Sequence, residues 1–208
     1  MAPKSIKTEE ASISSSKACV ENNKPPFSAI CKILSYWSDG QVSQGTGFFF
    51  GSRTVITVAH NLYRRDANYA DKVVVIPGAN RTGEPFGKFE VGPTSFDWHR
   101  NYESKQHDRD ADPYDIGVIW LPQPIGDKTK WWDLGSMSDT EARPGQRVVT
   151  CGFPLGPNPE LQLQTGTIVN DFDGMIQYDA DFGGGLSGAP IWPEANSFPY
   201  ICTVALHK

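Results

Sequence analysis

Ser187 lies in a setting that suggests nucleophilic chemistry. It belongs to the run Gly183-Gly184-Gly185-Leu186-Ser187-Gly188-Ala189-Pro190. Glycines let the backbone turn tightly, so that amide groups and a hydroxyl can converge on one carbonyl group. We therefore predict Ser187 as a nucleophile, with the backbone N–H groups of Gly185 and Ser187 as an oxyanion hole. Taken alone, such a run is more typical of an ordinary surface turn, so the prediction requires a partner base.

His60 is the candidate base. It ends the segment Thr57-Val58-Ala59-His60, directly after an apolar strand expected over residues 54–58. A serine hydroxyl is a poor nucleophile until a neutral imidazole accepts its proton. A single histidine at the end of a strand more often has a structural role, and a third group is needed to favour catalysis.

Asp115 supplies that third group. It immediately precedes the apolar run Ile116-Gly117-Val118-Ile119-Trp120-Leu121, a position suited to a buried carboxylate that orients an imidazole. The alternative is an aspartate that only caps the strand, in an acidic loop (108–115) that is solvated or binds calcium.

A metal site is the second chemical alternative. It would combine His60, His99 and His107 with Asp108 or Asp110, but these residues do not have a recognised ligand spacing. We therefore expect no metal site.

The elements that must position these residues are strands. Short apolar runs, such as 29–34, 45–50, 54–59, 72–77 and 147–153, alternate with Gly, Pro, Asn and Asp, while no 12-residue stretch keeps a convincing helical period. The pattern predicts an all-β fold with little helix. Residues 1–24 are rich in Ser, Lys and Glu and are interpreted as a flexible arm or pro-segment, and residues 25–208 as the folded domain.

Composition restricts the partners. Among 208 residues the net charge is −5, the basic residues are scattered, and no apolar run approaches 18 residues. We expect a monomer that binds neither nucleic acid nor membrane. No secretory signal is visible at the N-terminus, so the localisation stays open. Of the four cysteines, Cys31, Cys151 and Cys202 lie in strand-like settings typical of free buried thiols.

The order His60, Asp115, Ser187 on an all-β pattern resembles the trypsin-like serine protease superfamily, and within it the glutamyl endopeptidase branch of bacteria and fungi. The segments that carry the resemblance are Gly45-Thr46-Gly47-Phe48, Thr57-Val58-Ala59-His60, Pro85-Phe86-Gly87, Tyr114-Asp115-Ile116-Gly117, Gly152-Phe153-Pro154 and Gly184-Gly185-Leu186-Ser187-Gly188-Ala189-Pro190. The resemblance covers residues 26–207.

The resemblance implies two packed antiparallel six-stranded β-barrels, about 25–122 and 140–208, with the second barrel incomplete if the C-terminal strand is missing. It implies a serine endopeptidase that cleaves peptide or protein substrates through an acyl-enzyme, with His60 as base, Asp115 as its orienting partner, Ser187 as nucleophile and Gly185 in the oxyanion hole. It implies no metal and no organic cofactor. The alternative is a non-catalytic or truncated homologue that binds peptides or protein partners.

Substrate preference is implied by three residues. His207 matches a histidine that contacts an acidic substrate side chain in the glutamyl branch, and an imidazole can pair with a carboxylate. Phe182 stands where the branch usually has threonine, which removes one hydroxyl contact. Asp181 leaves a preference for basic side chains open. The resemblance therefore implies cleavage after Glu or Asp, with cleavage after Lys or Arg as the alternative.

Overall fold

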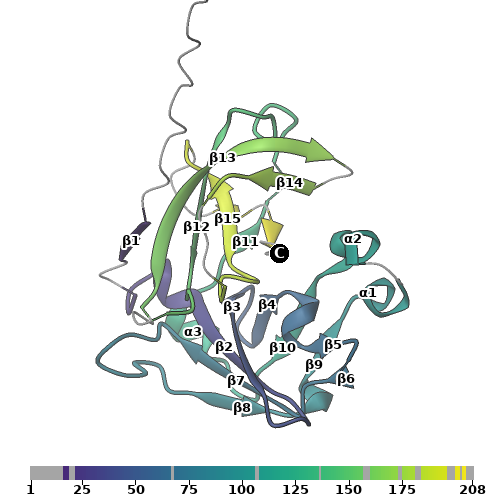
Figure 1. Cartoon of the computed structure of the whole chain (residues 1–208). Coiled ribbons are helices and arrows are strands. Elements are labelled where there is room, and N and C mark those ends of the chain that lie inside the picture. Colours follow the sequence, from purple (N-terminus) through teal and green to yellow (C-terminus); the bar gives the residue numbers. More distant parts are fainter. Residues whose placement is uncertain are drawn as a thin grey trace, which may run out of the picture.

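The computed structural model in Figure 1 describes residues 16–18, 22–66, 68–105, 108–135, 137–156, 160–172, 175–180, 184–195, 200–201 and 203–204. Two curled antiparallel sheets dominate it, one above the other in this view.

The first sheet has seven strands in the order β8-β7-β2-β3-β4-β10-β9. Its strands are β2 (Ile30–Tyr36), β3 (Val42–Phe49), β4 (Thr54–Thr57), β7 (Lys72–Pro77), β8 (Phe89–Val91), β9 (Phe96–Trp98) and β10 (Gly117–Trp120). Neighbouring strands pair antiparallel throughout, and side chains along β2 alternate between buried and half-buried because successive residues point to opposite faces.

The second sheet has the order β1-β13-β12-β15-β17, with β14 paired to the other end of β13. Its strands are β1 (Ser16–Ala18), β12 (Arg147–Gly152), β13 (Gln162–Phe172), β14 (Met175–Tyr178), β15 (Pro190–Pro193) and β17 (Thr203–Val204). β13 pairs with three strands, β1, β12 and β14, and the register of the β13–β14 pair shifts between Ile168 and Asn170. Two small pairs complete the strands: β5 (Tyr63–Arg64) with β6 (Asn68–Tyr69), and, in parallel, β11 (Asp133–Leu134) with β16 (Tyr200–Ile201).

Helix is a minor component, as expected. The α-helices are α1 (Arg100–Ser104), α2 (Asp108–Ala111) and α3 (Gly126–Thr129), and the 3-10 turns are η1 (Phe27–Ala29), η2 (Ala59–Asn61), η3 (Pro93–Ser95) and η4 (Asp112–Tyr114). These short pieces connect strands, and η2 and η4 carry the segments that hold His60 and Asp115.

The predicted fold class is confirmed: two curled antiparallel sheets with few helices. The first sheet has seven strands instead of six, and Phe96–Trp98 forms one of its edges by pairing with β10. The second sheet gains β1 from the segment interpreted as an arm, because Ser16 to Ala18 pair with Gln164 to Gln162. The boundaries proposed for the arm and the two barrels stay predictions.

One hydrophobic core joins the two sheets. It combines first-sheet residues such as Ile33 and Phe49 with Cys151 and Trp192 of the second sheet and with Phe153, which directly follows β12. Trp132, on the connection between the sheets, is buried, and its ring centroid lies 5.3 Å from that of Trp192. A smaller core of Val148, Ile168, Leu186, Ala189 and Ile191 fills the second sheet. Cys31 and Cys151 are buried thiols, as expected for these two residues, whereas Cys19 and Cys202 lie outside the described residues.

Candidate active site

His60 and Asp115 contact each other at two points. Asp115 Oδ2 lies 2.6 Å from His60 Nδ1, and Asp115 Oδ1 accepts a hydrogen bond of 2.9 Å from the His60 backbone amide. The Asp115 side chain is 6% exposed and the His60 side chain 30% exposed. The carboxylate is therefore buried with its hydrogen bonds made, while part of the imidazole faces solvent.

The register of two strands brings these residues together. Gly117 of β10 pairs with Thr57 of β4, so the end of β4 that leads to His60 adjoins the start of β10 that follows Asp115. A side chain at Gly117 would come within 2.6 Å of the Leu62 side chain, so glycine allows the turn after β4 to pack closely there. The contact between His60 and Asp115 thus arises from ordinary sheet pairing.

The loop that carries Ser187 lies against the turn that carries His60. The Ser187 carbonyl oxygen accepts hydrogen bonds from the Thr46 amide at 2.8 Å and from Asn61 Nδ2 at 3.0 Å. Gly185 and Gly188 have φ of +100° and +88°, which only glycine adopts easily. Within the described part of the chain, neither the Gly185 amide nor the Ser187 amide donates a backbone hydrogen bond.

Thr46 connects the Ser187 loop to the first sheet. Its hydroxyl donates to the Gly185 carbonyl at 2.9 Å and accepts from the Phe153 amide at 3.0 Å. Its own carbonyl accepts from the Thr57 hydroxyl at 2.7 Å. One strand of the first sheet therefore fixes two segments of the second.

Gln44, two residues earlier on β3, repeats this connection. Its side-chain nitrogen donates to the carbonyl oxygens of Phe153 at 2.9 Å and Pro154 at 3.2 Å. The segment Gly152-Phe153-Pro154 carries part of the family resemblance, and its backbone contacts with Gln44 and Thr46 give it a role in docking the sheets.

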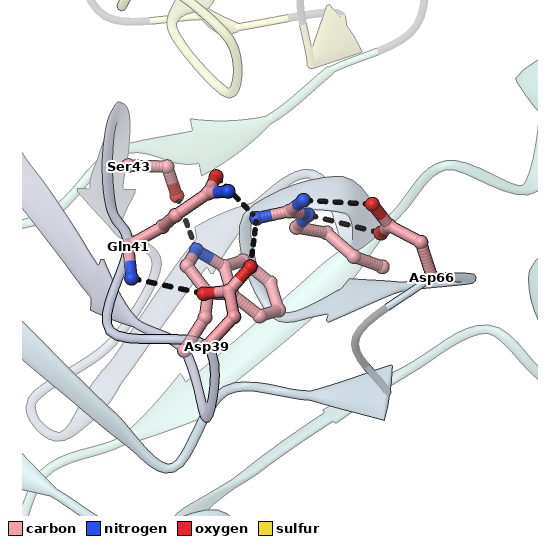
Figure 2. A network of polar contacts seen from close by, with 6 residues as sticks. Asp39, Gln41, Ser43 and Asp66 are labelled. Atoms are coloured by element: carbon pink, nitrogen blue, oxygen red, sulfur yellow. Dashed lines mark hydrogen bonds and ion pairs between the residues drawn. The ribbon is translucent and has the colours of Figure 1, made fainter.

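Arg64 connects the chain just after His60 to the turn between β2 and β3, through the polar contacts drawn in Figure 2. Arg64 donates to both carboxylate oxygens of Asp66, at 3.2 and 2.8 Å, and to Gln41 Oε1 at 3.3 Å. Its guanidinium carbon lies 5.0 Å from the Trp37 ring centroid. The hydrogen bonds from Arg64 lower the pKa of the Asp66 carboxyl below its ordinary value.

Aromatic rings pack beside the same turn. Tyr63 stacks on Trp98 with ring centroids 5.0 Å apart and meets Tyr102 edge to face at 6.3 Å. Burial, followed by the negative charge of Glu103, raises the pKa of Tyr63, and Arg65 opposes this in part. Trp98 is thus a packing residue.

The remaining predicted residues have different outcomes. His207, Phe182 and Asp181 lie outside the described residues. His99 caps α1 by accepting from the Asn101 amide at 3.2 Å. Among the described residues no three His, Cys, Asp or Glu side chains lie close enough to hold a metal ion.

No helix in the described part of the chain is long and apolar enough to cross a membrane.

Sequence reasoning missed the roles of Thr46, Thr57 and Asn61. A threonine between two glycines (Gly45 and Gly47) in an apolar run is a weak signal of a polar contact to another segment. Nothing in the sequence indicates that its partner lies 139 residues away.

Comparisons with known proteins agree with this architecture. The family model for the trypsin-like peptidase domain matches residues 45–198. A glutamyl endopeptidase of Bacillus licheniformis is 29% identical over 187 residues, which cover 88% of this chain and 55% of that protein. An extracellular metalloprotease of Bacillus subtilis is 27% identical over 169 residues, covering 80% and 52%. The chain spans about half the length of these curated relatives.

Solved structures share the fold. A Glu endopeptidase in complex with MPD superposes with a TM-score of 0.70 at 18% identity, over 91% of this chain and 83% of that one. The protease Anisep from Arthrobacter nicotinovorans superposes with a TM-score of 0.71 at 19% identity, over 91% of this chain and 86% of that one. An inactivated protease paralogue of the scabies mite superposes with a TM-score of 0.60 at 15% identity, over 87% of this chain and 83% of that one. The fold alone therefore does not decide whether a protein turns over substrate.

The family model covers most of the chain, in agreement with the two-sheet fold, and confirms the family resemblance seen in the sequence. This chain belongs to the trypsin-like peptidase domain family.

Proposed function

We propose that this chain is a serine endopeptidase in which Ser187 is the nucleophile, His60 the general base and Asp115 its orienting partner. The observation that carries the proposal is the two-point contact between Asp115 and His60, at 2.6 Å to the ring nitrogen and 2.9 Å to the backbone amide. A carboxylate in this position accepts a hydrogen bond from the Nδ1–H group and leaves the Nε2 lone pair free to act as a base.

The reaction would proceed in two halves. Ser187 Oγ attacks the scissile carbonyl carbon while its proton passes to His60 Nε2, and the new oxyanion is stabilised by the amides of Gly185 and Ser187. The C–N bond then breaks, and the leaving amine takes the proton from His60. Water, deprotonated by His60, hydrolyses the acyl-enzyme and regenerates the Ser187 hydroxyl.

Covalent labelling with a fluorophosphonate probe tests the nucleophile. We expect the folded chain to be labelled at Ser187, and Ser187→Ala to abolish the labelling because Ser187 is the serine proposed to react through His60. Ser38→Ala, at an exposed serine in the turn between β2 and β3, is the matched control and should retain full labelling. A folded, unlabelled chain would instead support a non-catalytic homologue.

Asp115→Asn tests the orienting role. The amide keeps the shape of the carboxylate but favours the wrong imidazole tautomer, so kcat should fall by roughly 10⁴-fold while the fold is retained. Asp110→Asn, at an exposed position of α2, should leave kcat unchanged. Loss of less than about tenfold at Asp115 would contradict the assignment.

We further propose cleavage after Glu or Asp, with His207 as the group that pairs with the substrate carboxylate. The support is the identity to a glutamyl endopeptidase and the chemistry of an imidazole facing a carboxylate. Cleavage of a peptide library separates this preference from one for Lys or Arg through Asp181. His207→Ala should reduce kcat/KM for Glu substrates, relative to other substrates, by about tenfold or more.

A further inference from the structure

We infer that Asn61, the residue after the candidate base, is a positioning residue that sets the separation between His60 and Ser187. Its side chain is 3% exposed and lies between the two sheets. Asn61 Nδ2 donates to Thr57 Oγ1 at 2.9 Å and to the Ser187 carbonyl oxygen at 3.0 Å. The inference rests on the proposed function, because positioning matters only if His60 and Ser187 react together.

The chemistry of the partners fixes the orientation of the Asn61 amide. The Ser187 carbonyl oxygen can only accept, so a nitrogen must face it. The Thr57 hydroxyl donates its proton to the Thr46 carbonyl, so toward Asn61 it too must accept. Both contacts therefore require an N–H donor at residue 61.

These contacts close a ring of hydrogen bonds. Asn61 donates to Thr57, Thr57 donates to the Thr46 carbonyl, the Thr46 amide donates to the Ser187 carbonyl, and Asn61 donates to that same carbonyl. Every donor direction in the ring is determined, so the Ser187 peptide group has one favourable position relative to β3, β4 and η2. Hydrogen bonds in a buried ring of this kind reinforce one another.

The backbone at Asn61 is held as firmly as the side chain. Its carbonyl accepts from the buried Ser35 hydroxyl at 2.5 Å, and its amide donates to the Val58 carbonyl at 3.2 Å. A side chain at Gly45 would come within 2.5 Å of Asn61 Oδ1, so the carboxamide occupies space that only glycine leaves open. His60, the residue directly before Asn61, is held by Asp115. The base is therefore fixed by Asp115, and the peptide group of the nucleophile is fixed by the next residue, Asn61.

Asn61→Asp is the sharpest test, because it keeps the shape of the side chain and replaces the donor with an acceptor. With a peptide substrate we expect kcat to fall roughly 10- to 100-fold, because a small displacement of reacting groups is costly, with KM changed less than about twofold. Fluorophosphonate labelling should slow by the same factor. A purely structural asparagine would lower stability without this split between kcat and KM.

Ser28→Ala is the matched control. The Ser28 hydroxyl is also buried and also joins distant segments, through a hydrogen bond of 2.7 Å to the Thr129 carbonyl, but it lies outside the ring. It should lower stability and leave kcat unchanged. Labelling of Asn61→Asp within about twofold of the wild-type rate would overturn the inference.

Hydrogen exchange separates failure of this inference from failure of the proposed function. If the wild-type chain is not labelled, the proposed function fails, and hydrogen exchange alone then tests whether Asn61 positions the Ser187 loop. Faster exchange of the Thr46 amide and of residues 184–189 in Asn61→Asp, but not in Ser28→Ala, would support that positioning role. Unchanged exchange would refute it.

Discussion

At the residue scale, the candidate site depends on backbone positions that only glycine can occupy. Gly188 follows the candidate nucleophile with φ of +88°, and an added Cβ would overlap the Thr46 carbonyl and lie 2.5 Å from Thr57 Oγ1. The residue therefore has two reasons to be glycine: its own conformation and the close approach of β3 and β4.

Gly188→Ala separates these two reasons when compared with Gly145→Ala. Gly145 has a similar φ of +91° but nothing within 4 Å of an added Cβ. Gly145→Ala should cost about 1–2 kcal/mol of unfolding free energy from backbone strain alone. Gly188→Ala should cost more and slow labelling of Ser187 by tenfold or more, because the clash displaces the loop.

Urea denaturation and labelling rates measure both effects. Equal stability losses in the two variants, with normal labelling in each, would show that the loop tolerates displacement at Gly188.

The three proposed reacting residues were accessible to sequence reasoning because each one terminates or precedes an apolar run. The pattern of apolar residues along the sequence indicates where strands end, and side chains leave the core at strand ends. The contacts of Thr46 and Asn61 were not accessible, because they depend on how two sheets dock. Edge strands such as β9 and β1 also escaped notice, since three-residue strands carry almost no alternation.

At the element scale, β3 is the strand that joins the two halves of the site. Thr46 satisfies the Gly185 carbonyl and the Phe153 amide with one hydroxyl, and Gln44 contacts the carbonyls of Phe153 and Pro154. Because these partners are backbone groups, the contacts depend on main-chain positions in the second sheet more than on its side chains.

Thr46→Val removes the hydroxyl while keeping the shape of the side chain. It should lower the unfolding free energy by roughly 2–4 kcal/mol, because two buried backbone groups lose their partner at about 1–3 kcal/mol each. Labelling of Ser187 should also slow, since Gly185 belongs to the proposed oxyanion hole.

Thr150→Val is the control for that substitution. Thr150 is also buried, at 1% exposed, but its hydroxyl has no hydrogen-bond partner among the described residues. Removing an unpaired buried hydroxyl should be neutral or stabilising. The interpretation of Thr46 fails if the two valine variants have the same urea midpoint.

At the scale of the whole molecule, one hydrophobic core spans both sheets and contains both described cysteines. Cys31 belongs to β2 of the first sheet and Cys151 to β12 of the second, and both side chains are fully buried. A shared core favours cooperative unfolding, so the two sheets should not open independently.

The thiols of Cys31 and Cys151 report on this cooperativity. Burial raises the pKa of the Cys31 thiol well above its ordinary value and also shields the thiol from reagents, so we expect no alkylation of the native protein at pH 8. The unfolded chain ionises at the ordinary thiol pKa, near 8.5. The contribution of Cys31 to the free energy of unfolding is therefore fully present below that pH and declines as the pH rises above it.

Pulse alkylation in increasing urea at pH 8, followed by peptide mapping, should show Cys31 and Cys151 becoming reactive over the same narrow range of urea concentration. If Cys151 became reactive at clearly lower urea than Cys31, the second sheet would open alone, and the ring through Thr46 and Asn61 would not couple the two halves of the molecule.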